Sequence, residues 1–123
     1  MKSKKNRASS RELRPRFRIL SGRKIAFGPG KADLLERIFR TGSLGEAAAR
    51  MDMSYMRAWS LVREMNNCFK QPVVALARGG REHGGAKLTE TGRRALELYR
   101  RMEEASRKAV QSDWRALKKL LRR

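Results

Sequence analysis

Cysteine is almost absent from this sequence: Cys68 is the only one in 123 residues. A single thiol forms no disulfide within the chain and no cysteine-based metal cluster, which excludes a disulfide-stabilised scaffold and a zinc-ribbon type of site. Cys68 lies beside Phe69, and a small apolar packing role is its simplest interpretation. A lone thiol in a small basic protein suits a reducing compartment.

Long apolar runs are also missing. No stretch approaches the roughly 20 apolar residues that a membrane-spanning helix needs. The N-terminus is basic, but no hydrophobic segment of a secretory signal follows it. The hydrophobic content of 40% is enough for the modest core of one domain. We therefore expect a cytoplasmic protein that does not contact membranes.

The residues that enzymes and metal sites require do not occur in usable combinations. The sequence offers no Ser-His-Asp set, no Cys-His pair and no isolated acidic pair in an apolar setting. His83 has no further metal ligands nearby and is expected to be an exposed loop residue. The glycine pairs at positions 79–80 and 84–85 do not match the phosphate-binding pattern G-x-x-x-x-G-K-[ST]. We expect no enzymatic activity, no cofactor and no metal.

Acidic residues are few relative to basic ones. The chain has 31 Lys and Arg against 12 Asp and Glu, which gives a formal charge of +19. Such a charge creates a long-range field that attracts polyanions and releases their counterions on contact. Nucleic acid is therefore the first partner class predicted. On charge alone an anionic membrane surface comes second, and ribosomal or packaging roles also stay open.

Changes in composition and in hydrophobic periodicity divide the chain into three parts. Residues 1–16 are basic, have too few apolar residues to fold alone and are expected to form a disordered tail or a DNA-contacting arm. Residues 17–92 are expected to form a DNA-binding domain, and residues 93–123 a C-terminal helix that serves dimerisation. Within these parts we expect a strand or short hairpin over 17–27, helices over 31–40, 43–50 and 54–69, strands over 73–77 and 86–88, and a helix from Glu90 onward.

The segment from Thr41 to Asn67 predicts two helices that meet across a very short turn. Ser43 and Glu46 form an S-x-x-E capping box, in which each side chain satisfies a backbone donor of the first turn. Three alanines at 47–49 keep this helix slim, and Ser54 is a good N-cap for the helix that follows. With the two strands and the last helix, the order predicts a mainly α fold: a winged helix-turn-helix with a small β-hairpin wing and a long C-terminal helix.

The second helix of the pair has two opposed faces when residues are placed 100° apart. The inward face is expected to carry Tyr55, Ala58, Val62, Met65 and Phe69. The outward face is expected to carry Met56, Arg57, Ser60, Arg63, Glu64 and Asn67. Trp59 and Asn66 flank the apolar face, and Leu61 lies at its other edge. A purely structural surface helix also presents polar residues, so the pattern alone leaves both interpretations open.

The residue types on the outward face favour DNA recognition. Arg57 and Arg63 are candidates to bond guanine O6 and N7 together, because a guanidinium presents paired donors. Ser60 and Met56 are weaker candidates at base edges, and Ser54 is placed for a phosphate at the helix N-terminus. The wing cations are expected to reach a minor groove or the backbone. The full candidate set is Ser43, Ser54, Met56, Arg57, Ser60, Arg63, Asn67, Arg78, Arg81 and Lys87.

The last helix carries more apolar residues than so small a domain can cover. They are Leu96, Tyr99, Met102, Ala105, Ala109, Val110, Leu117, Leu120 and Leu121, interrupted at 111–113. An apolar stripe of this length normally needs cover, so we expect a homodimer through the C-terminal helix. The alternative is a solvated tail that frays after Val110.

Three stretches resemble a known family. They are LLERIFRTGSLGEAAARMDMSYMRAWSLVREMNN at 34–67, the strand after Pro72, and GGAKLTETGRRALELYR at 84–100. The most specific run is SYMRAW followed by MNN. Together they resemble the N-terminal DNA-binding domain of ModE-type molybdate-responsive transcription regulators, a relative of the LysR-type winged helix. The resemblance implies a dimer that binds a palindromic double-stranded DNA operator through residues 54–67 and the wing.

In full-length members of that family, C-terminal oxyanion-binding domains hold molybdate. Only some 30 residues follow Gly92 in this sequence, so we do not expect this chain to bind molybdate. The hypothesis favoured by the sequence is a sequence-specific transcription regulator. One alternative is a nonspecific architectural nucleic-acid-binding protein, for which the charge of +19 suffices. Another is a protein-interaction adaptor that uses the C-terminal helix and has lost DNA binding.

Overall fold

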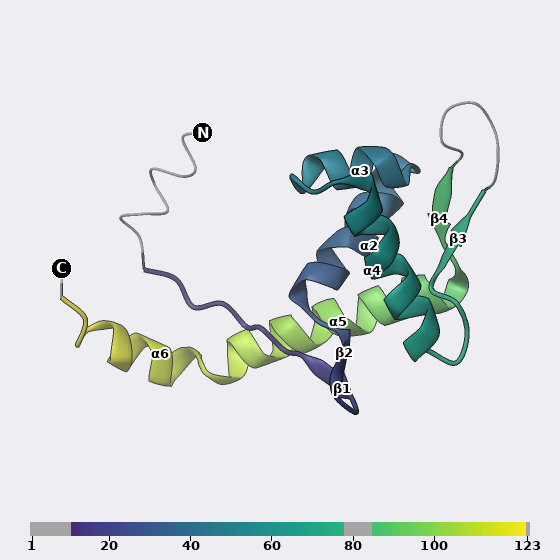
Figure 1. Cartoon of the computed structure of the whole chain (residues 1–123). Helices are drawn as coiled ribbons and strands as arrows, with labels where there is room; N and C mark the ends of the chain where they lie inside the picture. The colour runs from purple at the N-terminus through teal and green to yellow at the C-terminus, as the bar shows by residue number, and fades with distance from the viewer. Residues whose placement is uncertain (1–10, 78–84, 123) are drawn as a thin grey trace. The chain divides into compact units, whose positions relative to one another are not determined.

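A computed structural model describes residues 11–77 and 85–122 of the chain (Figure 1). Residues Arg16–Arg100 form one compact unit, and the described residues on either side of it belong to a second unit. The candidates Arg78 and Arg81, like His83, lie outside the described residues. No helix in the described part is both long enough and apolar enough to cross a membrane.

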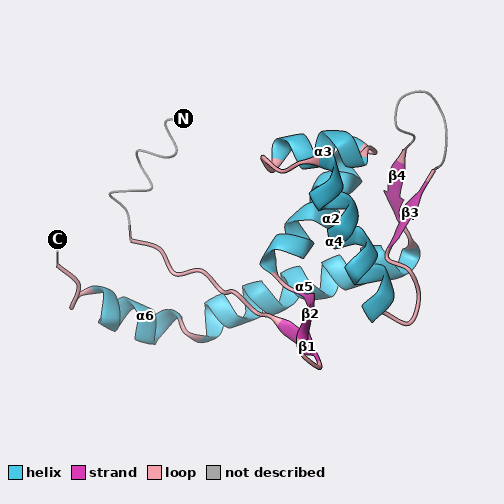
Figure 2. Ribbon diagram, viewed as in Figure 1, coloured by secondary structure: helices cyan, strands magenta, loops and turns pink. Residues whose placement is uncertain are grey.

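The described secondary structure is mainly helical, as the sequence predicts (Figure 2). In chain order the elements are β1 (Ile19–Ser21), β2 (Lys24–Phe27), α2 (Pro29–Thr41), α3 (Leu44–Arg50), α4 (Tyr55–Cys68), β3 (Val74–Leu76), β4 (Ala86–Leu88), α5 (Glu90–Ala109) and α6 (Gln111–Lys118). Both strand pairs are antiparallel hairpins, β1 with β2 and β3 with β4. The winged helix-turn-helix is confirmed by the order α2, α3, α4, β3, β4.

The three helices α2, α3 and α4 enclose the core. Fully buried side chains come from α2 and α4, and the small Ala47 and Ala48 let α3 pack closely against them. The principal buried residues are Leu34, Leu35, Ile38, Ala47, Ala48, Ala58, Leu61, Val62 and Met65. Burial of apolar surface at this convergence is the main stabilising term of the unit.

Three residues differ in burial from the sequence prediction. Helical periodicity groups Phe39 with Leu34, Leu35 and Ile38 on one buried face, but Phe39 is 59% exposed. The guanidinium of Arg93 lies 5.9 Å from its ring centroid. Tyr55, the first residue of α4, is 42% exposed instead of inward. Leu61, expected at an edge, is buried.

The caps that open α3 and α4 largely follow the sequence. The Ser43 hydroxyl accepts from the amide of Glu46 at 3.1 Å, and the Ser54 hydroxyl accepts from the amide of Arg57 at 3.0 Å. The other half of the predicted capping box differs: the amide of Ser43 donates to the Thr41 hydroxyl at 3.2 Å rather than to Glu46. Between the helices, Asp52 has a φ of 54°, the left-handed conformation that turns the chain sharply.

The start of α2 also differs from the prediction. The sequence predicts a helix over 31–40, but α2 begins earlier, at Pro29. Proline is well suited to the first helical position, because its missing amide is one that would have no partner within the helix. Gly28 therefore serves as the N-cap, without a side chain to accept from the first turn.

An aromatic cluster joins the β1–β2 hairpin to α4 and α5. The ring of Phe27 packs edge-on against Tyr99 at 5.2 Å and against Phe69 at 5.7 Å. Tyr99 is 1% exposed, and its hydroxyl donates to the carbonyl of Phe17 at 2.7 Å. Edge-to-face pairs of this kind add roughly 0.5–1.5 kcal/mol beyond their area. The hairpin is thus held by its buried end while its turn at Gly22 points outward.

Asn66 fixes the base of the wing to α4. Its side-chain oxygen accepts from the amides of Val73 at 2.7 Å and Val74 at 3.2 Å, and its Nδ2 donates to the carbonyl of Val74 at 3.1 Å. The wing is tied a second time to the C-terminal end of α2, where the amide of Ala86 donates to the carbonyl of Gly42 at 3.0 Å. The strands of the wing therefore start from a fixed position beside α4.

The entry into α5 requires glycine at position 92. The Thr89 hydroxyl caps the helix by accepting from the Gly92 amide at 2.9 Å, and it donates to the carbonyl of Pro72 at 2.6 Å. A Cβ on Gly92 would overlap the carbonyl oxygen of Val73 and lie 2.9 Å from its carbonyl carbon. Only a residue without a side chain lets α5 approach the strand so closely.

The second unit contains the end of α5 and all of α6. The single C-terminal helix expected from the sequence is divided at Val110, which separates α5 from α6. The interruption at 111–113 in the apolar stripe coincides with this break. Apolar side chains remain largely exposed on both sides of it, namely Met102, Val110, Leu117, Leu120 and Leu121.

Replacing Gly92 with alanine should lower the free energy of unfolding by about 1–3 kcal/mol, because the added methyl group meets backbone that cannot yield easily. Gly30→Ala is the matched control, since a Cβ there meets nothing within 4 Å. Urea unfolding followed by circular dichroism should show Gly30→Ala as stable as the unmodified chain or slightly more so. Equal stability of both variants would contradict the close approach.

Asn66→Ala should lower the free energy of unfolding by about 1–3 kcal/mol, because it leaves amides of the wing base without their acceptor. Asn66→Asp keeps the acceptor and loses the donor, so its free energy of unfolding should lie between those of Asn66→Ala and the unmodified chain. The neighbouring Asn67 is exposed, so Asn67→Ala should stay within about 0.5 kcal/mol in the same urea titration. A loss at Asn67 as large as that at Asn66 would count against the anchoring role.

Candidate nucleic-acid interface

The candidate interface centres on the exposed side of α4. Alternation of buried and exposed positions along this helix places Ala58, Val62 and Met65 in the core and leaves the intervening polar residues outside. Of the predicted outward set, Met56, Arg57, Ser60, Arg63, Glu64 and Asn67 are all exposed. Met56 is the most prominent apolar side chain of the helix, 64% exposed.

Three predicted residues are brought together in one hollow. Ser60, Arg63 and Asn67 line an open hollow of about 540 Å³, which is bordered on its other side by Ser21 and Lys24 of the β1–β2 hairpin. The Arg63 guanidinium lies 5.1 Å from the centroid of the Trp59 ring. This cation–π contact restrains a long side chain while leaving its donor edge available.

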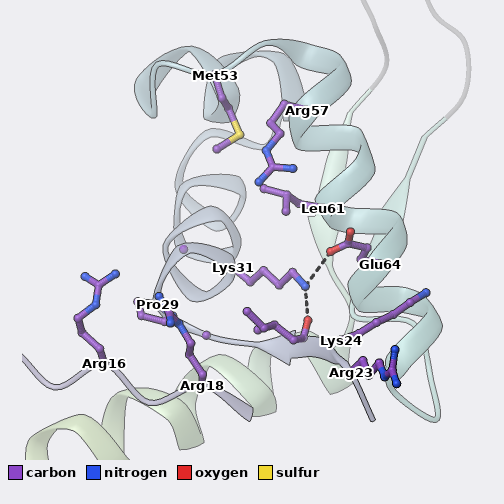
Figure 3. Close-up of a pocket in the computed structure, with 13 residues that line it drawn as sticks. Arg16, Arg18, Arg23, Lys24, Pro29, Lys31, Met53, Arg57, Leu61 and Glu64 are labelled. Carbon is purple, nitrogen blue, oxygen red and sulfur yellow. Dashed lines mark hydrogen bonds and ion pairs between the residues drawn. The ribbon is translucent and has the colours of Figure 1, made fainter. Parts of the chain in front are cut away.

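Arg57 belongs to a second hollow, of about 590 Å³, on another side of Glu64 (Figure 3). Met53, Leu61 and Glu64 line it together with the start of α2 and the β1–β2 hairpin. Lys31 crosses its floor with only 7% of its surface exposed. The Lys31 ammonium contacts Glu64 at 2.9 Å and donates to the carbonyl of Ile25.

Glu64 is the acidic residue of this face, and its charge is compensated. The hydrogen bond from Lys31 is the main cause that lowers its pKa below the ordinary value, and burial acts in the opposite direction. The nearby charges of Lys31, Arg57 and Lys24 lower it further. The carboxylate is therefore ionised at neutral pH, and its negative charge is neutralised by a buried cation.

The remaining predicted residues lie at the ends of helices and on the wing. Ser43 and Ser54 are the N-caps of α3 and α4, and each hydroxyl already accepts one backbone amide. A serine hydroxyl that accepts can still donate its proton to a phosphate. Lys87 is exposed on β4, opposite Ala75.

Two groups of residues at this surface were not singled out from the sequence. Asn66 was placed only at the edge of the apolar face, whereas it fixes the wing to α4. The hairpin cations Arg18, Arg23 and Lys24 line the hollow that Arg57 enters. Their signal was the basic pair directly after the Ser21-Gly22 turn.

Comparison with known proteins gives consistent relatives. No family model matches the chain. The molybdenum transport protein ModE of Azotobacter vinelandii is 44% identical over 70 residues, 57% of this chain and 26% of that protein. The molybdenum-pterin-binding protein MopB of Rhodobacter capsulatus is 39% identical over 90 residues, which are 73% of this chain and 33% of that protein. The DNA-binding transcriptional dual regulator ModE of Escherichia coli K12 is 36% identical over 96 residues, which are 76% of this chain and 37% of that protein.

The match in structure concerns the fold. Full-length CbnR, solved in complex with its target DNA, aligns with a TM-score of 0.52 at 22% identity, covering 69% of this chain and 28% of CbnR. The chain spans between about a quarter and just over a third of the length of the curated relatives named above. By sequence the chain is thus a homologue of ModE-type regulators across 57–76% of its length, and by structure it has the winged-helix fold of a LysR-type protein.

Proposed function

We propose that this chain is a cytoplasmic, sequence-specific transcription regulator that binds double-stranded DNA with α4 and the wing. The observation that carries the proposal is the exposed face of α4, which joins two arginines, a serine and a prominent methionine on a helix that begins at a capped turn. This is the arrangement in which the second helix of a helix-turn-helix enters a major groove. The names of the E. coli relative and of CbnR support DNA as the partner.

Each residue of the face has a role that follows from its chemistry. Arg63, held against Trp59, and Arg57 present paired donors suited to a guanine. Met56 offers an apolar contact for a thymine methyl group, and Ser60 a hydroxyl for a base edge. Ser54 and the first amides of α4 suit a phosphate, as do Ser43 and Lys87 beside the groove. Arg78 and Arg81 keep the wing role that the sequence predicts for them.

Arg63→Ala and Arg57→Ala should each weaken binding to the preferred site by about 1–3 kcal/mol and relax the preference at one base position. The measurement is selection of bound sequences from random duplex DNA, followed by fluorescence anisotropy on the selected site and on random duplex. Arg94→Ala, on α5, is the matched loss of one charge and should leave the preference intact. Equal weakening on both duplexes would contradict base reading by the two arginines.

The same selection separates the rival functions. A nonspecific architectural protein would yield no preferred sequence, and the charge of +19 favours that alternative. An adaptor that has lost DNA binding would bind neither duplex. Repeating the selection with molybdate should return the same palindrome, because we propose no molybdate site in this chain. A sequence preference that changes with molybdate would contradict the proposal that this chain has no molybdate site.

We also propose a homodimer through the C-terminal helices. The apolar side chains of Met102, Val110, Leu117 and Leu121 are at least 40% exposed, and exposed apolar stripes of this kind mark interaction surfaces. Two copies related by a twofold axis would place two α4 helices on the two halves of a palindrome.

Removing the residues after Val110 should convert the dimer into a monomer in sedimentation-velocity experiments, since it deletes the apolar residues of α6. A full-length Leu117→Ser/Leu121→Ser variant should show the same shift without shortening the chain. Leu20→Ser, which removes an exposed leucine from the β1–β2 hairpin, should leave the dimer unchanged. A dimer that survives both C-terminal changes would refute this interface.

A further inference from the structure

The β1–β2 hairpin presents a group of cations to which the face of α4 gives no role. Arg18, Arg23 and Lys24, together with Arg16 before the hairpin, line the hollow of about 590 Å³ that Arg57 enters (Figure 3). They come from both sides of the turn at Gly22, so a short segment of chain brings four positive charges to one place. All four residues are exposed.

Unlike Arg40 and Arg100 of the same unit, these hairpin arginines have no carboxylate partner among the described residues. Arg100 contacts Asp33 at 2.9 Å and Glu36 at 2.8 Å, and Arg40 also contacts Glu36. Among the described residues, no carboxylate lies within ion-pair distance of Arg16, Arg18 or Arg23. The one carboxylate among the described residues of the lining is Glu64, which Lys31 already neutralises. The hollow is therefore strongly positive.

The backbone reinforces this charge. The hollow includes Gly28, Pro29 and Gly30, where α2 begins without a side-chain cap. The first amides of a helix lack partners within the helix and carry the positive end of its dipole. Cationic side chains and a helix N-terminus thus face one space, and both attract an oxyanion.

The position of the hollow identifies the source of that oxyanion. Arg57, Leu61 and Glu64 of α4 form one of its walls, and Lys24 also borders the hollow of Ser60, Arg63 and Asn67. The hairpin therefore adjoins the face that we propose reads DNA. A helix in a major groove lies between two sugar–phosphate backbones, so cations beside it meet phosphates rather than base edges.

We propose that the β1–β2 hairpin is a phosphate clamp, in which Arg18, Arg23 and Lys24 bind the DNA backbone that flanks the groove occupied by α4. This inference rests on the proposed function. It adds a contact on the hairpin side of α4 to those of the wing. The clamp strengthens binding to any duplex sequence and carries no base preference of its own.

The test is the salt dependence of duplex binding by an Arg18→Gln/Arg23→Gln/Lys24→Gln variant. Each phosphate contact contributes a slope of about 0.9 to the plot of log affinity against log salt, so the slope should fall by about 2–3. The loss should be the same on the selected site and on random duplex, and selection should return the unchanged preferred sequence. The affinity should be measured by fluorescence anisotropy at salt concentrations from about 50 to about 300 mM, a range wide enough to determine the slope.

Two matched variants separate a clamp from general charge. Arg37→Gln/Arg40→Gln/Arg94→Gln removes three charges from α2 and α5 and should change the slope by less than 1. Arg18→Lys/Arg23→Lys keeps the charge of the hairpin and should retain the slope. Circular dichroism and thermal unfolding of every variant should match those of the unmodified chain, because the substituted side chains are exposed.

The outcomes are distinct. An equal slope loss in the two glutamine triples would overturn the clamp while leaving DNA binding intact. An unmodified chain that binds no duplex would refute the proposed function and the clamp with it. Stabilisation of the unmodified chain by millimolar inorganic phosphate, lost in the hairpin triple and without any change in DNA slope, would assign the hollow to a free anion and also overturn the clamp.

Discussion

The pairing of the buried Lys31 ammonium is the interaction on which the arrangement of the proposed DNA-binding side depends. It joins three elements, because Lys31 belongs to α2, its hydrogen bond goes to Ile25 of β2 and its ion pair to Glu64 of α4. A charge with so little exposure is tolerated only when it is paired and hydrogen-bonded, and both conditions are met here. Movement of the hairpin would cost this ammonium its hydrogen bond to Ile25, and movement of α4 would cost it the ion pair with Glu64.

Other contacts hold the same helix at different points along its length. The Ser54 cap fixes its beginning, Asn66 attaches the wing near its end, and Phe69 packs against Phe27 just beyond it. Consequently the elements that border the proposed reading face, the hairpin and the wing base, are attached to α4 rather than to each other. On its outer side Glu64 is paired with Lys31 and Arg63 contacts Trp59, whereas the side chains of Arg57, Ser60 and Asn67 are exposed to a ligand.

Local signals in the sequence predicted the helix-turn-helix, the two strands of the wing and the N-caps, because each depends on residues within a few positions of one another. Which side chains face the core was predicted less well: Tyr55 was expected inward but is 42% exposed, because periodicity does not show which neighbouring elements cover a residue. The role of Asn66 was missed, since its partners Val73 and Val74 become visible only once the chain has turned at Pro72. The hairpin cations were overlooked because their significance comes from α2 and α4 beside them.

The attachment of the wing base through Asn66 has a consequence for how a duplex would be accommodated. With the side-chain amide holding Val73 and Val74, the distance between α4 and the root of the wing is set by the protein. A duplex that engages both must adjust its own groove width and curvature to that distance. Sequences whose base steps deform easily would then be preferred even at positions that no side chain touches, so the flexibility of the DNA becomes part of what is selected.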